Sequence, residues 1–276
     1  CIIHDGTSYG YQMWLNNNPK YVRFDGLFGQ ISVIFPEYDA FVMFNASDPR
    51  EYEFIKDIFN FFPRGFIDSI SEKSAEELAQ YKRDSIRKCY DWSEATPRND
   101  KMEKLVDGKK INLKIRDNIS ALGIMTYFTW SKHAGRMEYC KFDFKSETPK
   151  FIWKEKNSEE NSIDIGFDGD FAISEATIAD VKFDMAVQGN WIGDKLKLNI
   201  RPLGRTQRRE MIFKFTKNGA KIKSNALPNL GELLVFYAYF SGFKIPNAIR
   251  SLIVNHVIKI ANAVWMDPDA KGKFEK

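Results

Sequence analysis

Cysteine and histidine are scarce in this sequence, and this limits the chemistry that it offers. The three cysteines, Cys1, Cys89 and Cys140, are widely separated and form no C-x-x-C pair. This spacing argues against zinc ligation and against a disulfide framework, and it favours a reducing compartment such as the cytoplasm. His133 and His256 are isolated in the sequence, so no carboxylate–histidine spacing resembles a metal site.

Large charge imbalances and long apolar runs are also missing. The net charge is only +4, and lysine and arginine are spread among acidic residues, which argues against nucleic-acid binding. The apolar segments 230–243 and 248–265 do not reach the roughly 18 uncharged residues of a membrane span. We expect them to form helices that pack on the protein, with a membrane-surface helix as the alternative. The sequence contains no P-loop, G-x-G-x-x-G or G-x-S-x-G, and no cofactor is implied.

The first 62 residues have the pattern of a small sheet followed by a helix. Segments 9–15, 20–24 and 28–35 are predicted strands, and Asp25-Gly26 is expected to interrupt the second and third. The continuous apolar run 40–44 predicts a strand that is buried on both faces. Residues 49–62 carry apolar side chains at helical spacing, with a proline at each end. These strands and this helix should form an antiparallel sheet with one helix across a face.

The pattern changes along the rest of the chain. Residues 69–92 predict a charged helix, and 63–100 are expected to connect two domains. From 101 to 276 short alternating segments predict an antiparallel β-barrel or sandwich with C-terminal helices. Asn218-Gly219 is the clearest hairpin signal in this region. The predicted fold class is therefore α+β.

Several linked motifs in residues 8–62 resemble one enzyme superfamily. They are Tyr9-Gly10-Tyr11-Gln12-Met13-Trp14, then Arg23-Phe24-Asp25-Gly26-Leu27-Phe28-Gly29-Gln30, then Phe35-Pro36-Glu37-Tyr38-Asp39-Ala40. Their order and spacing are similar to those of the C-terminal strands and helix of serine hydrolases related to class C β-lactamases, penicillin-binding proteins and esterases. The superfamily has a K-T-G or H-x-G strand beside its active site, and a branch of it carries an appended β-rich domain. Trp191 and Leu196 resemble a late strand of that appended domain.

The resemblance implies a substrate-cleft wall around the strand that corresponds to K-T-G. The residues implied are Arg23, Asp25, Gly26, Leu27, Gly29 and Gln30. Backbone groups near Gly26 and Leu27 would line the cleft and supply an oxyanion-hole N–H. Arg23 or Gln30 would contact a substrate carboxylate or carbonyl. A bend in the sheet with no functional role is the alternative explanation of Gly26 and Gly29.

The sequence departs from this superfamily at the catalytic residues. In that superfamily, acyl transfer uses a serine in S-x-x-K and a Y-x-N or equivalent. No Y-x-N occurs, and the string Ser85-Ile86-Arg87-Lys88 lies in a charged helix after the closing helix, where we interpret it as a coincidence. The chain also starts at Cys1 without an initiator methionine. We therefore expect a C-terminal portion of a hydrolase, processed or taken from a longer sequence, whose N-terminal region and nucleophile are missing.

Two single features allow other interpretations, which the surrounding sequence does not support. In the first interpretation, Cys1 is an N-terminal nucleophile that uses its own amino group as base. Against it, the segments that follow do not have the pattern of a layered sheet built around the N-terminus. Asp164, Asp168 and Asp170 match half of a calcium loop, and the required final glutamate is absent. The sequence thus predicts no metal site. A full-length enzyme would cleave a small-molecule ester or amide through an acyl-serine, and the alternative is a non-catalytic β-domain for ligand binding, active-site gating or association.

Overall fold

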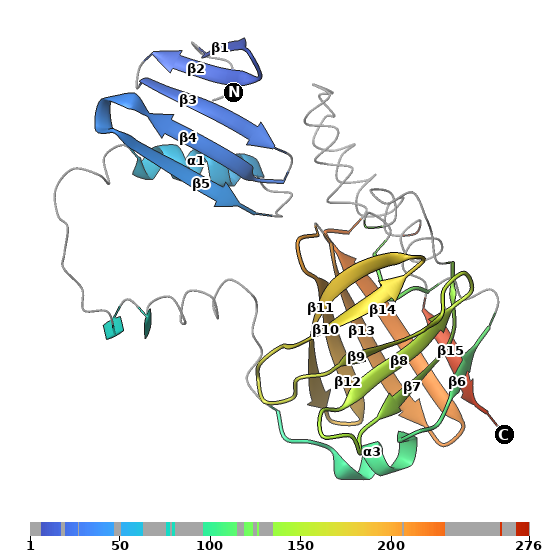
Figure 1. Cartoon of the computed structure of the whole chain (residues 1–276). Helices are drawn as coiled ribbons and strands as arrows, with labels where there is room; N and C mark the ends of the chain where they lie inside the picture. Colours follow the sequence, from blue (N-terminus) through green and yellow to red (C-terminus); the bar gives the residue numbers. More distant parts are fainter. Residues whose placement is uncertain are drawn as a thin grey trace. The chain divides into compact units, whose positions relative to one another are not determined.

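The chain forms two compact units, Cys1–Ser85 and Ile86–Lys276. The computed structural model describes residues 7–17, 20–26, 28–46, 51–62, 76–77, 79–80, 96–114, 119–123, 126, 135–205, 207–229, 260 and 269–275. The first unit is an antiparallel sheet with a helix, and the second is a nearly closed barrel-like sheet (Figure 1). The protein is therefore α+β with a β-rich domain, as the sequence pattern predicts.

The first unit is a five-stranded meander in which each strand pairs with the next along the chain. All neighbours are antiparallel, as expected for strands joined by short turns. Its strands are β1 (Thr7–Gly10), β2 (Met13–Asn17), β3 (Lys20–Gly26), β4 (Gln30–Phe35) and β5 (Ala40–Asn45). A single turn of 3-10 helix, η1 (Pro36–Tyr38), joins β4 to β5.

Two strand boundaries differ from the sequence prediction. The predicted strand 9–15 is wrong, because a tight turn divides it into β1 and β2. Tyr11 and Gln12 form this turn with φ of 53° and 64°, the left-handed region that two-residue hairpins require. The predicted interruption at Asp25-Gly26 is also wrong, because both residues belong to β3. The chain reverses after them, at Phe28 and Gly29, which have φ of 68° and 89°.

The predicted helix 49–62 is confirmed as α1 (Glu51–Phe61), which packs on one face of the sheet. Ile55 and Ile58 of the helix are buried, and they lie on one helical face. The buried sheet residues in the same cluster are Tyr21, Ile31, Val33 and Phe35. The ring of Tyr21 stacks on that of Phe59, with centroids 4.5 Å apart. This small core is the only cover that the described residues give to the sheet.

The second unit contains a ten-stranded antiparallel sheet. The strand order is β10-β11-β12-β13-β14-β15-β6-β7-β8-β9. The first five strands along the chain are β6 (Ile111–Leu113), β7 (Met137–Asp143), β8 (Lys150–Glu155), β9 (Glu160–Asp164) and β10 (Ala172–Ile178). The others are β11 (Val181–Ile192), β12 (Lys195–Pro202), β13 (Arg208–Thr216), β14 (Gly219–Leu227) and β15 (Ala270–Phe274). The predicted hairpin at Asn218-Gly219 is confirmed by the β13–β14 pair.

The sheet closes on itself almost completely. Its two end strands, β9 and β10, lie side by side, and the backbone N–H of Asp164 donates to Ser174 Oγ across the seam at 3.0 Å. The isolated bridge between Gly166 and Gln188 ties the same seam a few residues further on. Of the two architectures that the sequence left open, the structure therefore has the barrel.

Aromatic rings fill the middle of the barrel. The ring of Phe142 lies 5.0 Å from that of Phe213 and 5.3 Å from that of Phe151, and all three side chains are fully buried. Buried residues alternate with more exposed ones along β12, where Leu196, Leu198 and Ile200 are buried, whereas β11 is buried continuously from Met185 to Trp191.

Several predictions fall outside the described residues. The predicted C-terminal helices at 230–243 and 248–265 lie outside the described residues, except for Ile260, which is helical. Most of the predicted strand 123–130 also lies outside the described residues. Four described residues in the predicted helix 69–92, namely 76, 77, 79 and 80, are helical. Within the described residues, no helix has the length and apolar character needed to cross a membrane.

Candidate functional site on the five-stranded sheet

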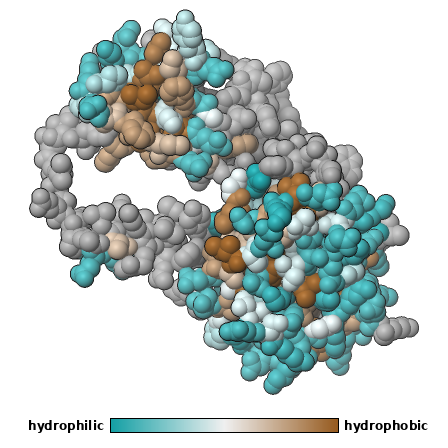
Figure 2. Space-filling model, viewed as in Figure 1, coloured by the Kyte–Doolittle hydropathy of each residue, from teal (hydrophilic) through white to brown (hydrophobic). Residues whose placement is uncertain are grey.

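The face of the sheet opposite α1 is apolar, and no described helix or strand covers it; we call it the open face. Its residues follow from strand register: Leu15, Val22, Ile34 and Phe41 form one cross-strand row, and Phe24, Ser32 and Met43 form the next. Neither row contains a charged side chain. Phe41 is 70% exposed and Met43 is 66% exposed. In Figure 2 hydrophobic atoms gather on this face of the unit. Contiguous exposed apolar patches mark interaction surfaces in proteins.

The prediction that residues 40–44 are buried on both faces is wrong. Burial alternates along β5, with Val42 and Phe44 packed toward α1 while Phe41 and Met43 lie on the open face. The strand also forms an edge of the sheet, because it pairs only with β4 among the described strands. A long apolar edge strand without proline or charge is an unusual feature, since such edges recruit another strand.

The turn between β3 and β4 brings three of the predicted cleft residues together. Gly26 lies opposite Gln30 in register, and a side chain at Gly26 would meet Gln30 Cβ at 3.0 Å. Glycine therefore keeps the Gln30 side chain close against the backbone of β3. The carbonyl of Gly29 accepts from the backbone N–H of Ala46 at 3.2 Å, which ties the turn to the end of β5. Leu27 lies outside the described residues.

The end of β3 extends beyond its neighbour β2. Pairing with β2 stops at Trp14 and Arg23, whereas pairing with β4 continues to Gly26 and Gln30. On the β2 side, no described strand pairs with the backbone of Phe24, Asp25 and Gly26. Backbone N–H and C=O groups in such a position bind an extended ligand or stabilise a developing oxyanion.

Arg23 and Asp25 lie on the other face of β3, toward α1. Arg23 is fully buried, and its Nε lies 2.7 Å from Asp25 Oδ1. Its guanidinium also faces the rings of Trp14 and Phe59, at 6.0 Å and 5.7 Å from their centroids. Burial raises the pKa of Asp25, and the positive charge of Arg23 offsets part of that rise. The six predicted cleft residues therefore do not share one face: Gly26 and Gln30 are separated from Arg23 and Asp25 by the sheet.

Sequence reasoning did not single out the residues that dominate the open face, Phe24, Phe41 and Met43. Phe24 alternates with the charged residues Arg23 and Asp25, which is a period-two signal, whereas the run 40–44 is apolar at every position and gives no such signal for Phe41 and Met43.

The S-x-x-K string at Ser85 lies outside the described residues. A second S-x-x-K string, Ser241-Gly242-Phe243-Lys244, which the sequence analysis missed, lies outside them as well. Among the described residues, no group of three or more His, Cys, Asp or Glu side chains has the arrangement of a metal site. The half calcium loop at 163–170 begins at the end of β9, and the N–H of Asp170 donates to Asp168 Oδ1 at 3.2 Å within it.

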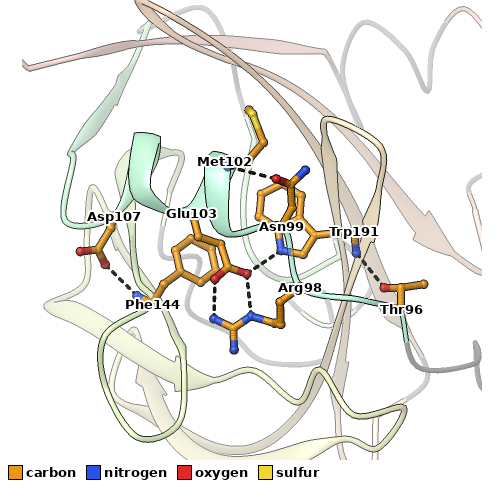
Figure 3. A network of polar contacts seen from close by, with 8 residues as sticks. All are labelled: Thr96, Arg98, Asn99, Met102, Glu103, Asp107, Phe144 and Trp191. Carbon is orange, nitrogen blue, oxygen red and sulfur yellow. Dashed lines mark hydrogen bonds and ion pairs between the residues drawn. The ribbon is translucent and has the colours of Figure 1, made fainter.

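A polar network closes one end of the barrel (Figure 3). Glu103 of α3 (Asp100–Val106) accepts two hydrogen bonds from Arg98, at 2.6 Å and 2.7 Å, and one from Trp191 Nε1 at 2.9 Å. The Asn99 side chain caps α3 by accepting from the N–H of Met102. These bonds attach the segment before the barrel to β11, so the network has a structural role.

Comparison with known proteins identifies no relative. No protein family model, no curated protein and no solved structure matches this chain.

Proposed function

We propose that residues 7–62 form one layer of a serine-hydrolase domain of the β-lactamase and penicillin-binding-protein type. In this proposal the open face is covered by polypeptide that carries the nucleophile. The observation that carries it is the open face itself, which leaves seven apolar side chains without a second layer among the described residues. They are Met13, Leu15, Val22, Phe24, Ile34, Phe41 and Met43.

Two further features support the proposal. The elements follow in the order strand, glycine turn, strand, proline-containing turn, strand and helix. This order is similar to that of the superfamily that residues 8–62 resemble. In addition, Gly26 and Gln30 belong to the same side of the sheet as the apolar rows, so a layer over those rows would border the glycine turn. The backbone at the end of β3, with which no described strand pairs on the β2 side, would then line the cleft between the two layers.

The proposed chemistry is acyl transfer to serine. A serine Oγ attacks the carbonyl carbon of an ester or amide while a neutral lysine accepts its proton. The oxyanion that forms is stabilised by backbone N–H groups, and the end of β3 would supply one of them. The leaving alcohol or amine takes the proton, and water then hydrolyses the acyl-serine. Phe24 rather than Arg23 would contact the substrate, because Arg23 lies beneath α1.

The test is to isolate the protein from its source with an antibody against the barrel unit and to treat it with a fluorophosphonate probe. Mass spectrometry then locates the labelled serine. We expect stoichiometric labelling at a serine in polypeptide other than residues 1–276, in the same chain or in a tightly bound one. Absence of labelling would contradict the proposal. Labelling at Ser85 or Ser241 would support a serine hydrolase but contradict a nucleophile outside this chain.

The second candidate function is a non-catalytic role for the barrel unit. It is favoured by the large core of that unit, which described residues of the barrel fill.

A further inference from the structure

Lysine side chains gather on one outer side of the barrel, on strands β12, β13, β14 and β15. One cross-strand row there consists only of lysines, because the register pairs each of them with the next one. The row is Lys195, Lys214, Lys221 and Lys271. All of these side chains are exposed. Since neighbouring strands lie about 4.8 Å apart, the row is about 14 Å long.

Three more lysines belong to the same outer surface. Each lies two residues along its strand from a member of the row, and therefore on the same face of the sheet. They are Lys197, Lys223 and Lys273, and we call them together with the row the lysine wall. Acids are nearly absent from these strands: residues 195–227 contain ten Lys or Arg and residues 270–274 contain two, against one acid, Glu210.

The nearby acids neutralise only part of the lysine wall. Lys197 pairs with Glu210 at 2.6 Å, and Lys214 Nζ lies 4.0 Å from Asp194 Oδ2 in the turn before β12. Two other acids border β15, namely Asp269 and Glu275, and the second of them pairs with Lys110.

The other members of the wall include lysines that repel one another. Among the described residues, no acidic partner is found for Lys195, Lys221, Lys223 or Lys273. Like charges directly opposite each other in a sheet are destabilising. The row therefore costs stability unless an anionic partner binds to it.

Acidic residues collect on the opposite side of the barrel. Residues 158–184, which include β9 and β10, contain eight Asp or Glu against one lysine, Lys182. β14 and β15 are the two middle strands of the ten, whereas β9 and β10 are the end strands that meet at the seam. The net charge of +4 does not reveal this separation, because the two sides offset each other. Separated charge of this kind orients a protein at a charged surface.

The composition of the lysine wall favours one class of anionic partner. No aromatic side chain of its four strands is exposed, since Phe213 and Phe215 are buried and Phe274 packs against the core. Surfaces for single-stranded nucleic acids stack bases on exposed aromatic rings. The major groove of a duplex admits a helix or a two-stranded ribbon, which is narrower than a wall of four strands. Lysine is a hydrated point charge that attracts closely spaced anions without selecting their geometry.

Apolar residues border the lysine wall. Ile192 lies opposite Lys195 in register and is 57% exposed. The apolar segments 230–243 and 248–265 belong to the chain between β14 and β15, and a helix on a membrane surface is one of the two expectations for them from the sequence. Basic residues next to apolar ones are typical of proteins that bind anionic membrane surfaces.

We propose that the lysine wall binds the surface of a membrane that contains anionic phospholipids. The lysine Nζ groups pair with the phosphate and carboxylate groups of the lipid headgroups, and the acidic seam faces water. Each lysine near such a surface strengthens binding about fivefold. This inference does not depend on the hydrolase proposal, because all of its residues belong to the barrel unit.

The test measures sedimentation of the full chain with lipid vesicles. Vesicles of phosphatidylcholine with about one third phosphatidylserine should bind the protein, and vesicles of phosphatidylcholine alone should bind it much less. A wall variant with Lys195→Gln, Lys214→Gln and Lys221→Gln should bind the anionic vesicles about a hundredfold more weakly, from about fivefold per lysine.

The matched control is a triple variant with Lys154→Gln, Lys156→Gln and Lys182→Gln. It changes the net charge by the same amount, but its residues belong to the side of the barrel near the seam. Because salt screens charges more than about 10 Å from the lipid surface, this variant should weaken binding about threefold or less. Thermal unfolding checks the fold of both variants. The melting temperature of the wall variant should equal or exceed that of the wild type, since repulsion within the row is removed.

A second measurement uses the wild-type protein alone. Anionic vesicles should protect Lys214 and Lys221 from acetylation by an amine-reactive reagent and leave Lys156 reactive, as mass spectrometry of peptides would show. Three results would overturn the proposal. They are equal binding to the two kinds of vesicle, equal losses in the two triple variants, and release of the protein from the vesicles by a mixed-sequence oligonucleotide at an equal concentration of negative charge. The last result would favour nucleic acid as the partner.

Discussion

Trp191 and Trp153 both face the barrel interior, yet among the described residues only the indole N–H of Trp191 has an acceptor, Glu103 Oε1 at 2.9 Å. This contrast predicts that Trp→Phe lowers the free energy of unfolding by different amounts at the two positions. Both Phe variants lose a similar buried volume, but Trp191→Phe also loses a hydrogen bond to a carboxylate, worth about 1.5–3 kcal/mol. Trp191→Phe should therefore lower the free energy of unfolding by that much more than Trp153→Phe.

Urea unfolding of the two variants, followed by circular dichroism, measures this difference. An equal loss in both variants would mean that the Glu103 bond contributes nothing to the stability of the barrel. A larger loss in Trp153→Phe would mean that its N–H is bonded within the folded protein.

The open face gives a prediction on association. Phe41→Ser and Met43→Ser together remove the two most exposed apolar side chains of β5. Because they contact nothing in the α1 core, the double variant should keep the stability of the wild type within about 0.5 kcal/mol, as is usual for surface substitutions. It should bind less of a hydrophobic dye such as ANS and associate less at high concentration.

Val33→Ser is the matched control for this experiment. Val33 lies on the neighbouring strand but faces α1 and is fully buried, so its replacement should unfold or loosen the first unit and raise dye binding. Unchanged dye binding in the β5 double variant would mean that other residues cover the open face in solution.

The sequence predicted the parts of the fold that local periodicity determines. Ile55 and Ile58 recur at helical spacing, so α1 was found with its correct face, and Asn218-Gly219 identified the β13–β14 hairpin. The turn at Tyr11 and Gln12 was missed because neither residue is a typical turn former. An apolar run such as 40–44 has the same sequence pattern whether its second face is covered by this chain or not. The exposure of Phe41 could therefore be found only from the structure.

The candidate site was less predictable for a related reason. The motif that includes Arg23, Asp25, Gly26 and Gln30 is continuous in sequence, but a strand sends successive side chains to opposite faces. Only the register with β4 and the position of α1 reveal that Arg23 is enclosed, with Asp25 on its side of the sheet, while Gly26 and Gln30 border the open face. The lysine wall is likewise spread over four strands, so its members come together only through the register of β12 to β15.

The Asp25 carboxyl predicts a pH effect on stability. Burial raises its pKa from the ordinary value of 3.8, so the folded state binds the proton more tightly than the unfolded state does. Stability from this group is therefore present below the unfolded pKa and is lost as the pH rises through the raised value. Asp25→Asn should remove this loss of stability. The melting temperature of the variant should therefore rise relative to that of the wild type as the pH increases above about 4. A difference that does not change with pH would show that the Arg23 ion pair fully offsets burial.

Cys140 gives the last prediction. Its side chain is fully buried on the inward side of β7, and burial raises the pKa of the thiol well above its usual range. Both effects suppress reaction, because alkylating agents need an accessible thiolate. In the native protein near pH 8, iodoacetamide should modify Cys140 only when the barrel opens, at a rate that urea raises in parallel with unfolding of the barrel. Mass spectrometry of peptides after timed labelling measures this rate, and Cys140→Ala provides the blank. Modification of Cys140 as fast as a free thiol, with no dependence on urea, would mean that the β6–β7 side of the barrel opens readily in solution.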